Sequence, residues 1–441
     1  MFTIDKAKHK KILKISLPAA FNSLLDMLQV ITDLIMVGTL SAFAVAAVGV
    51  GLQSLMLVFA ILTLFQVGTN ALISRFKGAG KMNQASLALS TLLQFASLVS
   101  FVVLPLWYFG SAGIYGWYDA SVEVRVLGTS YVQILTLMMP FIFMKLVFIT
   151  ALNATGDTKT PLYVKLVSIV LNVGLNYLLI FGHYGFPALG VEGAAIATVV
   201  VNMLELLLYM TLYVRGKTPF KPMVRFSKNI FFRALKVGLP ASFERTLTMG
   251  SFTFFTATIA SYGTEVLAGY QIGLRVEGLA FMPGIGFTIA AMALMGQGLG
   301  AKKPEQSHED VLLVMKYAIG LMFFLSLFMI FTPEMIVVLF TNDVETIKEA
   351  SLYLKIVGIS QIPLAISFVL SGALRGAGDS KRTLKINLIS LWFVRILPAF
   401  FLSWWLDNIM VVYFAMISDT FVKAVWLWVT FNKGEWMKIK V

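Results

Sequence analysis

Four polar residues lie at helical spacing inside the first long apolar segment, residues 14–37: Asn22, Asp26, Gln29 and Asp33. Steps of four, three and four place them within about a 60° wedge of one helix. A charged side chain at bilayer depth costs at least ~2.5 kcal/mol on insertion scales. Two carboxylates on one stripe therefore indicate a water-filled cavity or polar partners. The alternative is interhelical hydrogen bonding, which suits the two amides better than the two carboxylates.

A second polar face is predicted on the apolar segment 161–182. It carries Lys165, Ser168, Asn172 and Asn176, and the next segment adds Thr198 and Asn202. At about 1.5 Å per residue, Asn176 reaches a depth comparable to that of Asp33. A carboxylate among amide and hydroxyl oxygens could bind and release a proton, or ligate a small hard cation such as Na⁺. A buried polar cluster that holds helices together is the alternative.

The composition predicts the solvent in which these groups work. The chain has 441 residues, of which 58% are hydrophobic and 13% are charged, about half the charged fraction of a soluble protein. Apolar runs of ~20 or more residues recur along the whole length, which predicts an all-α integral membrane protein. We expect no cleaved signal peptide and, without cysteine, no disulfide or thiol chemistry. The net charge of +13 indicates no nucleic-acid partner, because the basic residues lie in short loops.

The apolar runs predict twelve spans. They cover approximately residues 13–37, 44–73, 86–110, 127–152, 161–182, 189–214, 231–260, 266–296, 311–340, 352–374, 384–406 and 409–431. One set of loops is rich in Lys and Arg and includes the tail with Lys440, whereas the opposite set is acidic and includes Asp119. The positive-inside rule then places both termini in the cytoplasm of a prokaryotic cell, with the chain in its cytoplasmic membrane.

Two segments recur with one offset and divide the chain nearly in half. LKISLPAAF (13–21) returns as LKVGLPASF (235–243), and ALNATGDTK (151–159) returns as ALRGAGDSK (373–381), both shifted by 222 residues. We therefore predict an N-terminal lobe over 1–214, a basic cytoplasmic linker over 215–230 and a C-terminal lobe over 231–441. Six spans per half is an even number, so the two six-helix lobes share one orientation. Transporters of this kind bind substrate between the repeats and rock one against the other.

The polar stripe belongs to the first half only. Under the 222-residue offset Asp26 maps to Thr248 and Asp33 to Phe255, whereas Tyr131 keeps a tyrosine, Tyr353. The second half has its own charged residues, which form either a second polar centre or structural pairs: Glu244, Arg245, Arg275 and Glu277. Asp419 and Lys423, four residues apart, predict an internal ion pair. Lys145 and Glu205 lie near the cytoplasmic ends of their spans and are expected to snorkel in part.

Several activities lack their residues. RFKGAGK (75–81) ends in Gly-Lys, but Arg75 stands where a phosphate loop needs glycine, so no ATPase is encoded. Transport against a gradient must then draw on an ion gradient. The three histidines are expected in loops or termini, which argues against a histidine-based site in the membrane: His9, His183 and His308. We expect no enzyme, and no cofactor beyond a bound proton or Na⁺.

The chain resembles the multidrug and toxic compound extrusion (MATE) family over essentially its whole length. The matching segments are SLP (16–18), TDLIMVGTLSAFAVAAVG (32–49), ALNATGDTKTP (151–161), LNVGLNYLLIFG (171–182), LGVEGAAIATVV (189–200) and ALRGAGDSK (373–381). The resemblance implies two six-helix lobes in a V shape and antiport of amphipathic, often cationic compounds against H⁺ or Na⁺. Asp33 stands where the family has its first-helix aspartate, and Asn172 matches the fifth-helix asparagine.

The chain departs from the family at Asn176, where many members carry a second aspartate. That departure leaves one carboxylate at this position and leaves the coupling ion open. Another branch of the family uses acidic residues on helices 7 and 10. Here Glu244 lies earlier on helix 7, and the helix 10 position, near Leu364, is apolar. The site in the first half is therefore favoured.

The sequence thus predicts a monomeric secondary multidrug exporter that works by alternating access. The coupling residues are Asp33, Asn172, Asn176 and Thr198, with Na⁺ at Asp33 as the one possible metal. The cavity and substrate candidates are Asn22, Asp26, Gln29, Tyr131, Asn202, Glu244 and Glu277. A flippase for lipid-linked sugars is the alternative within the same fold, and it would need a cavity lined by arginines, for which Arg245, Arg275 and Arg395 are the candidates. A membrane enzyme and a passive channel are further alternatives, disfavoured by the missing His and Cys chemistry and by the two-lobe repeat.

Overall fold

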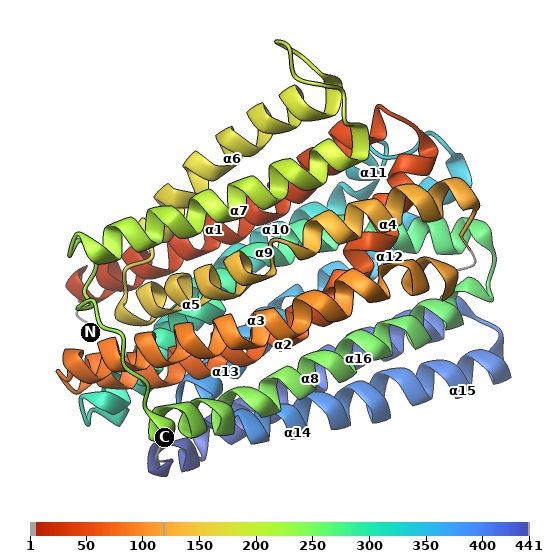
Figure 1. Ribbon diagram of the computed structural model, residues 1–441. Coiled ribbons are helices and arrows are strands. Elements are labelled where there is room, and N and C mark those ends of the chain that lie inside the picture. Colours follow the sequence, from red (N-terminus) through yellow and green to blue (C-terminus); the bar gives the residue numbers. More distant parts are fainter. Residues whose placement is uncertain (1–5, 118–119, 440–441) are drawn as a thin grey trace. The chain divides into compact units, whose positions relative to one another are not determined.

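The structure of the chain is a computed structural model that describes residues 6–117 and 120–439 (Figure 1). All regular elements in these ranges are helical. Asp119 and Lys440, which contribute to the loop-charge pattern, lie outside the described residues.

Each predicted span corresponds to one helix or to a broken helix. The first half contains α1 (Lys6–Gly38), α2 (Ala42–Gly78), α3 (Met82–Trp117), α4 (Val122–Thr136), α5 (Met139–Thr155), α6 (Lys159–Phe181) and α7 (Gly190–Val214). The second half contains α8 (Lys228–Ala260), α9 (Thr264–Gly300), α10 (Pro304–Phe331), α11 (Pro333–Val337), α12 (Val344–Ile359), α13 (Gln361–Gly376), α14 (Ser380–Ser390), the π-helix η1 (Leu391–Ile396), α15 (Leu397–Leu406), α16 (Ile409–Asn432) and the 3₁₀ helix η2 (Glu435–Lys438).

Membrane-spanning character is a property of most of these helices. Among the described residues, nine helical segments are long and apolar enough to cross a bilayer, or eleven if α4–α5 and α12–α13 each count as one bent span. The predicted span 231–260 is the twelfth. It forms the 33-residue helix α8, which falls outside the apolar set. Its charged and hydroxyl side chains account for that difference.

Prolines explain why three spans are broken. A proline ring clashes with the carbonyl four residues earlier and supplies no N–H. Pro140 lies four residues after Thr136, where α4 ends, and Pro363 lies four residues after Ile359, where α12 ends. The two breaks bend their spans by 50° and 55°. Pro398 follows the π-helix η1, whose wider turn is a common way to accommodate a disrupted hydrogen-bond ladder.

The chain forms two compact units. The N-terminal unit comprises Leu24–Gly238, and the C-terminal unit comprises Met1–Ser23 together with Leu239–Val441. The divisions therefore fall inside α1 and α8, so each unit receives the first part of the helix that opens the other half of the sequence. The lobe boundaries at 214 and 231 inferred from the repeat stay a prediction.

The internal repeat is visible in how these two helices pack. In the C-terminal unit, α1 crosses α9 where Gly286 approaches the backbone of Ala20 so closely that a methyl group would overlap it. In the N-terminal unit, α8 crosses α2 where Gly238 approaches the carbonyl of Leu64 in the same way. Leu64 and Gly286 are 222 residues apart. The crossing positions on α2 and α9 thus keep the offset found in the sequence, whereas those on α1 and α8, Ala20 and Gly238, are 218 residues apart and so differ from it by about one helical turn.

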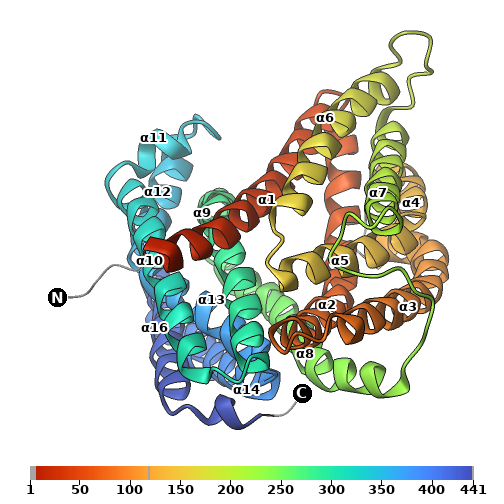
Figure 2. The same cartoon turned by 90° about the vertical axis from the view of Figure 1, so that its left-hand side faces the viewer.

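Within the N-terminal unit α2 packs on α3, α4 and α5, and α6 lies beside α7 (Figure 2). Within the C-terminal unit α9 packs against α10, α12 and α13, and α16 lies beside α13, α14 and α15 (Figures 1 and 2). The large apolar core around Phe287 joins α9, α10 and α13. These helices hold the polar groups described below in fixed positions.

The segment between α7 and α8 is fastened along α3. Three backbone N–H groups of the linker donate to hydroxyls along α3: Lys221 N to Ser86, Arg225 N to Ser90 and Ser227 N to Thr91. The hydroxyl of Ser90 also donates to the Arg225 carbonyl at 2.8 Å. The basic linker is therefore a fastened strap on the N-terminal unit along this stretch.

The histidine placement differs from the sequence expectation. The prediction that all three lie in loops or termini was wrong for His308, which lies in α10, whereas His9 lies near the N-terminus, in the first turn of α1. Both use aromatic neighbours: His9 Nδ1 is 2.5 Å from the Tyr317 hydroxyl, and His308 stacks on Phe431. Helical periodicity simply extends further toward the termini than the apolar pattern does.

Candidate functional site

The carboxylate of Asp33 meets the asparagines of α6 inside the N-terminal unit. Asn176 Nδ2 donates to Asp33 Oδ1 at 2.6 Å and to Asn172 Oδ1 at 3.3 Å. Both asparagines are fully buried, at 0% exposure. The four-residue spacing on α6 places the two amides one turn apart on the face toward α1. The structure therefore brings together three of the four predicted coupling residues.

Two polar atoms of this cluster remain unpaired among the described residues. Asn172 Nδ2 and Asn176 Oδ1 are buried and have no hydrogen-bond partner. An unpaired buried polar group costs about 1–3 kcal/mol. The cluster thus has one donor and one acceptor ready for a further proton, ion or polar group.

A second contact joins the same two helices closer to the start of α6. Lys165 Nζ forms an ion pair with Asp26 Oδ1 at 2.6 Å and donates to Gln29 Oε1 at 2.7 Å. The Lys165 side chain is 11% exposed, whereas that of Asp26 is 56% exposed. Asp26 and Gln29 were predicted as cavity residues, and the structure adds Lys165 as their partner.

A signal for that pairing was present in the sequence. Asp26 precedes Asp33 by seven residues, and Lys165 precedes Asn176 by eleven. The four extra residues on α6 correspond to about 6 Å of helix, which is the reach of an extended lysine side chain. The contact between Asp33 and Asn176 therefore sets a register in which Lys165 meets Asp26.

A third charged contact lies between α5 and α7. Lys145 and Glu205 form an ion pair with side-chain exposures of 13% and 4%. The expectation that both residues snorkel toward the membrane surface was wrong. Each finds its counter-charge inside the unit, which is the less costly arrangement for two charges that must stay in a span.

The charges of this polar region leave one negative charge over. Asp26 is balanced by Lys165 and Glu205 by Lys145. Asp33 forms no ion pair with any described residue. The group that donates a hydrogen bond to it, Asn176 Nδ2, belongs to a neutral amide. Tyr131 on α4 is buried and lies close enough to Asp33 for an electrostatic interaction between the two side chains. With these groups in their ionised forms, the region therefore has a formal net charge of −1, centred on Asp33.

Three other candidates have different surroundings. The Thr198 hydroxyl donates to the Ala194 carbonyl of its own helix at 3.0 Å, and Asn202 Nδ2 donates to the Thr198 carbonyl at 2.7 Å. Neither side chain is brought to Asp33 by a hydrogen bond of the described residues. Asn22 lies in the C-terminal unit, whereas the rest of its stripe lies in the N-terminal unit.

The C-terminal unit pairs its acidic candidates internally. Glu244 accepts from Arg375 and from Asn387, each at 2.6 Å, and Glu277 accepts from the Tyr353 hydroxyl at 2.6 Å. Arg375, on α13, was not among the sequence candidates. Its position in the last turn of α13 gave no sign that it reaches α8.

Two further charged groups of this unit are also engaged. The predicted ion pair between Asp419 and Lys423 is confirmed, with Oδ2 and Nζ 2.7 Å apart, and the Ser390 hydroxyl donates to Asp419 Oδ1. Arg395, in the π-helix η1, lies over the Phe255 ring at 4.3 Å from its centroid. Cation–π contact of this kind partly replaces the water that a guanidinium loses on burial.

The repeat also relates two of these contacts. Asn387 and Lys165 are separated by 222 residues, and each reaches the helix that opens its half. Lys165 binds Asp26 on α1, and Asn387 binds Glu244 on α8. The same position on the fifth span thus contacts the first span in both halves. In the first half both partners, Lys165 and Asp26, are charged, whereas in the second half only Glu244 is charged.

Fold and site together define the class. The described residues form only helices, with nine to eleven candidate spans, an internal repeat and charged groups buried inside the spans, and this combination is typical of a polytopic membrane transporter. The MatE family model matches residues 18–178 and 240–401, one match in each half. The chain belongs to the MatE family of membrane transporters.

Individual relatives agree with that assignment. A probable multidrug resistance protein NorM of Thermotoga maritima is 30% identical over 446 residues, covering 97% of this chain and 93% of the relative. Solved structures of a MOP superfamily transporter from Pyrococcus furiosus and of the Vibrio cholerae MATE transporter VcmN in the bent form superpose with TM-scores of 0.91 and 0.89 at 19% and 22% identity. They cover 98% and 97% of this chain, and 97% of each solved chain is matched. The expected all-helical MATE fold is confirmed.

Proposed function

We propose that the chain is a secondary active multidrug exporter that moves amphipathic or cationic compounds out of the cell against an inward flow of H⁺ or Na⁺. The proposal includes alternating access of the two repeat halves, cytoplasmic termini and no catalysis. The names of the multidrug resistance relatives support the substrate class. The observation that carries the coupling step is the single unbalanced carboxylate, Asp33, held by a buried amide pair.

The amide pair can serve both protonation states of Asp33. With the carboxylate ionised, Asn176 Nδ2 donates to both Asp33 and Asn172, as the structure has it. If Asp33 takes up a proton, rotation of both amides would let Asn176 Oδ1 accept from the Asp33 O–H and from Asn172 Nδ2. That rotation would pair the two atoms now unpaired and leave Asn176 Nδ2 and Asn172 Oδ1 unpaired instead, so the cluster would have as many paired amide atoms in one protonation state as in the other. Protonation would thus rearrange the contact between α1 and α6.

The same oxygens suit a sodium ion. Na⁺ is a hard cation that prefers oxygen ligands, and Asp33 Oδ, Asn172 Oδ1 and Asn176 Oδ1 lie within one cluster. Either ion would remove the single negative charge. A cationic substrate attracted by that charge would then compete with the ion, which is the differential binding that antiport requires.

The test is efflux of a cationic dye from vesicles that contain the purified protein. A pH gradient and a Na⁺ gradient are imposed separately, and only the coupling ion should drive transport. Asp33→Asn should abolish gradient-driven efflux and remove the dependence of dye binding on that ion. The matched control is Thr32→Val, because the neighbouring Thr32 hydroxyl bonds only its own helix, at Leu28. Full transport by Asp33→Asn, or binding that ignores both pH and Na⁺ in the unmodified chain, would exclude this function for Asp33.

A further inference from the structure

A basic cavity opens at the turn between α2 and α3, outside the polar region around Asp33. It has a volume of about 670 Å³. Its lining comes from the α2–α3 turn, the strapped linker and the first part of α8: Phe76, Gly80, Lys81, Met82, Asn83, Gln84, Lys221 and Arg233. Among these eight described residues three are cationic and none is acidic. We propose that this cavity binds the phosphate group of an anionic ligand, in the membrane the headgroup of an anionic phospholipid.

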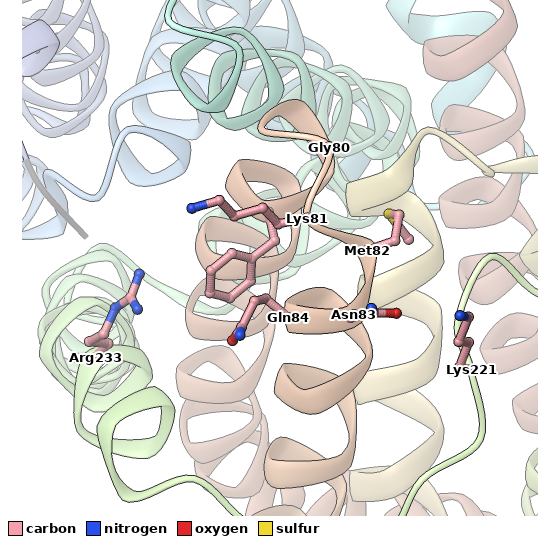
Figure 3. Close-up of a pocket in the computed structure, with 8 residues that line it drawn as sticks. Gly80, Lys81, Met82, Asn83, Gln84, Lys221 and Arg233 are labelled. Carbon is pink, nitrogen blue, oxygen red and sulfur yellow. The ribbon is translucent and has the colours of Figure 1, made fainter.

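The cationic side chains of the lining come from three separate segments of the N-terminal unit. In Figure 3, Lys81 and Gln84 lie between Arg233 on α8 and Lys221 on the linker. The Arg233 guanidinium is positioned over the Phe76 ring, 5.4 Å from its centroid. The Lys221 backbone is fixed by its bond to Ser86. The fold therefore holds the Arg233 guanidinium and the Lys221 backbone at the cavity.

A further guanidinium lies beside the cavity lining. Arg75, one residue before Phe76, is close enough to Arg233 for the two guanidinium charges to oppose each other. Like charges held together raise the affinity of the site for a multivalent anion. Phosphate suits the available donors, because ammonium groups bind it as point charges and a guanidinium can bind it in bidentate fashion. The side-chain amides of Asn83 and Gln84 add uncharged donors.

The position of the cavity favours a lipid as the source of the phosphate. The helices α2 and α3 are both candidate spans, and the cavity lies at the turn that connects them. Phospholipid headgroups lie at the ends of spans, and basic residues there attract anionic lipids. The segment RFKGAGK, which does not fit a nucleotide phosphate loop, thus forms one wall of a different kind of phosphate site.

A bound phosphate would also act on α8, the helix that passes from one unit to the other. The helix α8 passes from the N-terminal unit to the C-terminal unit at Gly238, five residues after Arg233. An anion bound in this cavity would link the first part of α8 and the linker to the α2–α3 turn. We expect anionic lipid to change the transport rate as well as to bind.

The experiment uses the purified full-length chain in a neutral detergent. Binding of short-chain phosphatidylglycerol, of phosphatidylcholine and of inorganic phosphate is titrated separately, followed by intact-complex mass spectrometry. Phosphatidylglycerol should bind saturably and phosphatidylcholine should not. Inorganic phosphate should compete with phosphatidylglycerol if the phosphate group itself is recognised. Comparing the binding of these two anions therefore distinguishes free phosphate from a lipid headgroup as the ligand. Lys81→Gln and Lys221→Gln should each weaken phosphatidylglycerol binding about fivefold; both side chains are exposed, so neither change should impair folding.

The repeat supplies the matched control. Lys303 occupies the position equivalent to Lys81, at the turn between α9 and α10, and it is equally exposed. Lys303→Gln removes the same charge from the same kind of turn and should leave phosphatidylglycerol binding unchanged. Equal losses from Lys81→Gln and Lys303→Gln would mean general charge attraction and would overturn the site. Absence of saturable binding by either anion would overturn it as well.

Discussion

Removing either charge of the contact between Lys165 and Asp26 should lower the stability of the protein by a different amount, because the two side chains differ in exposure. Asp26→Asn leaves an ammonium group whose side chain is only 11% exposed, with Gln29 as its remaining partner. Lys165→Met leaves a carboxylate that is 56% exposed and that water can hydrate. We therefore expect the loss of the aspartate charge to destabilise the protein more than the loss of the lysine charge.

The magnitudes follow from the two exposures. Breaking a fully buried pair costs about 3–5 kcal/mol, so Asp26→Asn, which strands the buried partner, should cost about 3 kcal/mol. Exposed pairs contribute about 0–1 kcal/mol, so Lys165→Met, which strands the hydrated partner, should cost about 1 kcal/mol. The double variant has no stranded charge and should cost about 1 kcal/mol, which gives a coupling energy of about 3 kcal/mol in the mutant cycle.

The assay is reversible unfolding in mixed micelles by a denaturing detergent, followed by tryptophan fluorescence. Each of the four proteins yields a free energy of unfolding under one set of conditions. The control pair is Ser111→Ala in the presence and absence of Lys165→Met, because the Ser111 hydroxyl bonds the Tyr108 carbonyl of its own helix, α3, and should show additive effects. A larger cost for Lys165→Met than for Asp26→Asn, or additivity between them, would refute the assignment of Lys165 as the counter-charge of Asp26.

Two further predictions concern other fixed contacts of the N-terminal unit. Glu205→Gln should cost about 3–5 kcal/mol in the same unfolding assay, because its partner Lys145 is buried as well; Glu205→Gln with Lys145→Met should recover most of that loss, and no recovery would contradict the pairing. Ser90→Ala removes both bonds to the Arg225 backbone and should cost only about 1–2 kcal/mol, while trypsin should cleave after Arg225 several times faster; cleavage at the original rate would show that the strap does not depend on Ser90.

The sequence predicted the helices well because one physical constraint dominates in a membrane. Backbone groups in lipid must bond within their own segment, so apolar length almost determines helix position. The breaks were not predicted, although Pro140 and Pro363 mark them, because a proline inside a span can either kink or end a helix. The division inside α1 and α8 was also missed, since a change of packing partner within a continuous helix leaves no trace in apolar periodicity.

The candidate site was predicted in part for a different reason. Helical spacing placed Asn172 and Asn176 on one face and gave Asp33 the same depth, and these three meet as expected. The Thr198 hydroxyl bonds the Ala194 carbonyl of its own helix instead, because depth along a span says nothing about the direction in which a side chain faces across the bundle. Glu205 was misjudged because a residue near the end of a span looks free to snorkel until its partner on another helix is known.

The charge balance of the N-terminal unit gives a physical reason for the asparagine at position 176. Two lysines offset two of the three carboxylates, so one negative charge remains at Asp33. A second aspartate at position 176 would lie within hydrogen-bond distance of the first, and two carboxylates that close cannot both stay ionised. Asn176 instead donates to Asp33, so the negative charge belongs to a single carboxylate rather than to a pair that shares a proton. Under the proposed antiport, such a region exchanges one monovalent cation for one cationic substrate. The hydrogen bonds of the amide pair would then differ between the two bound states.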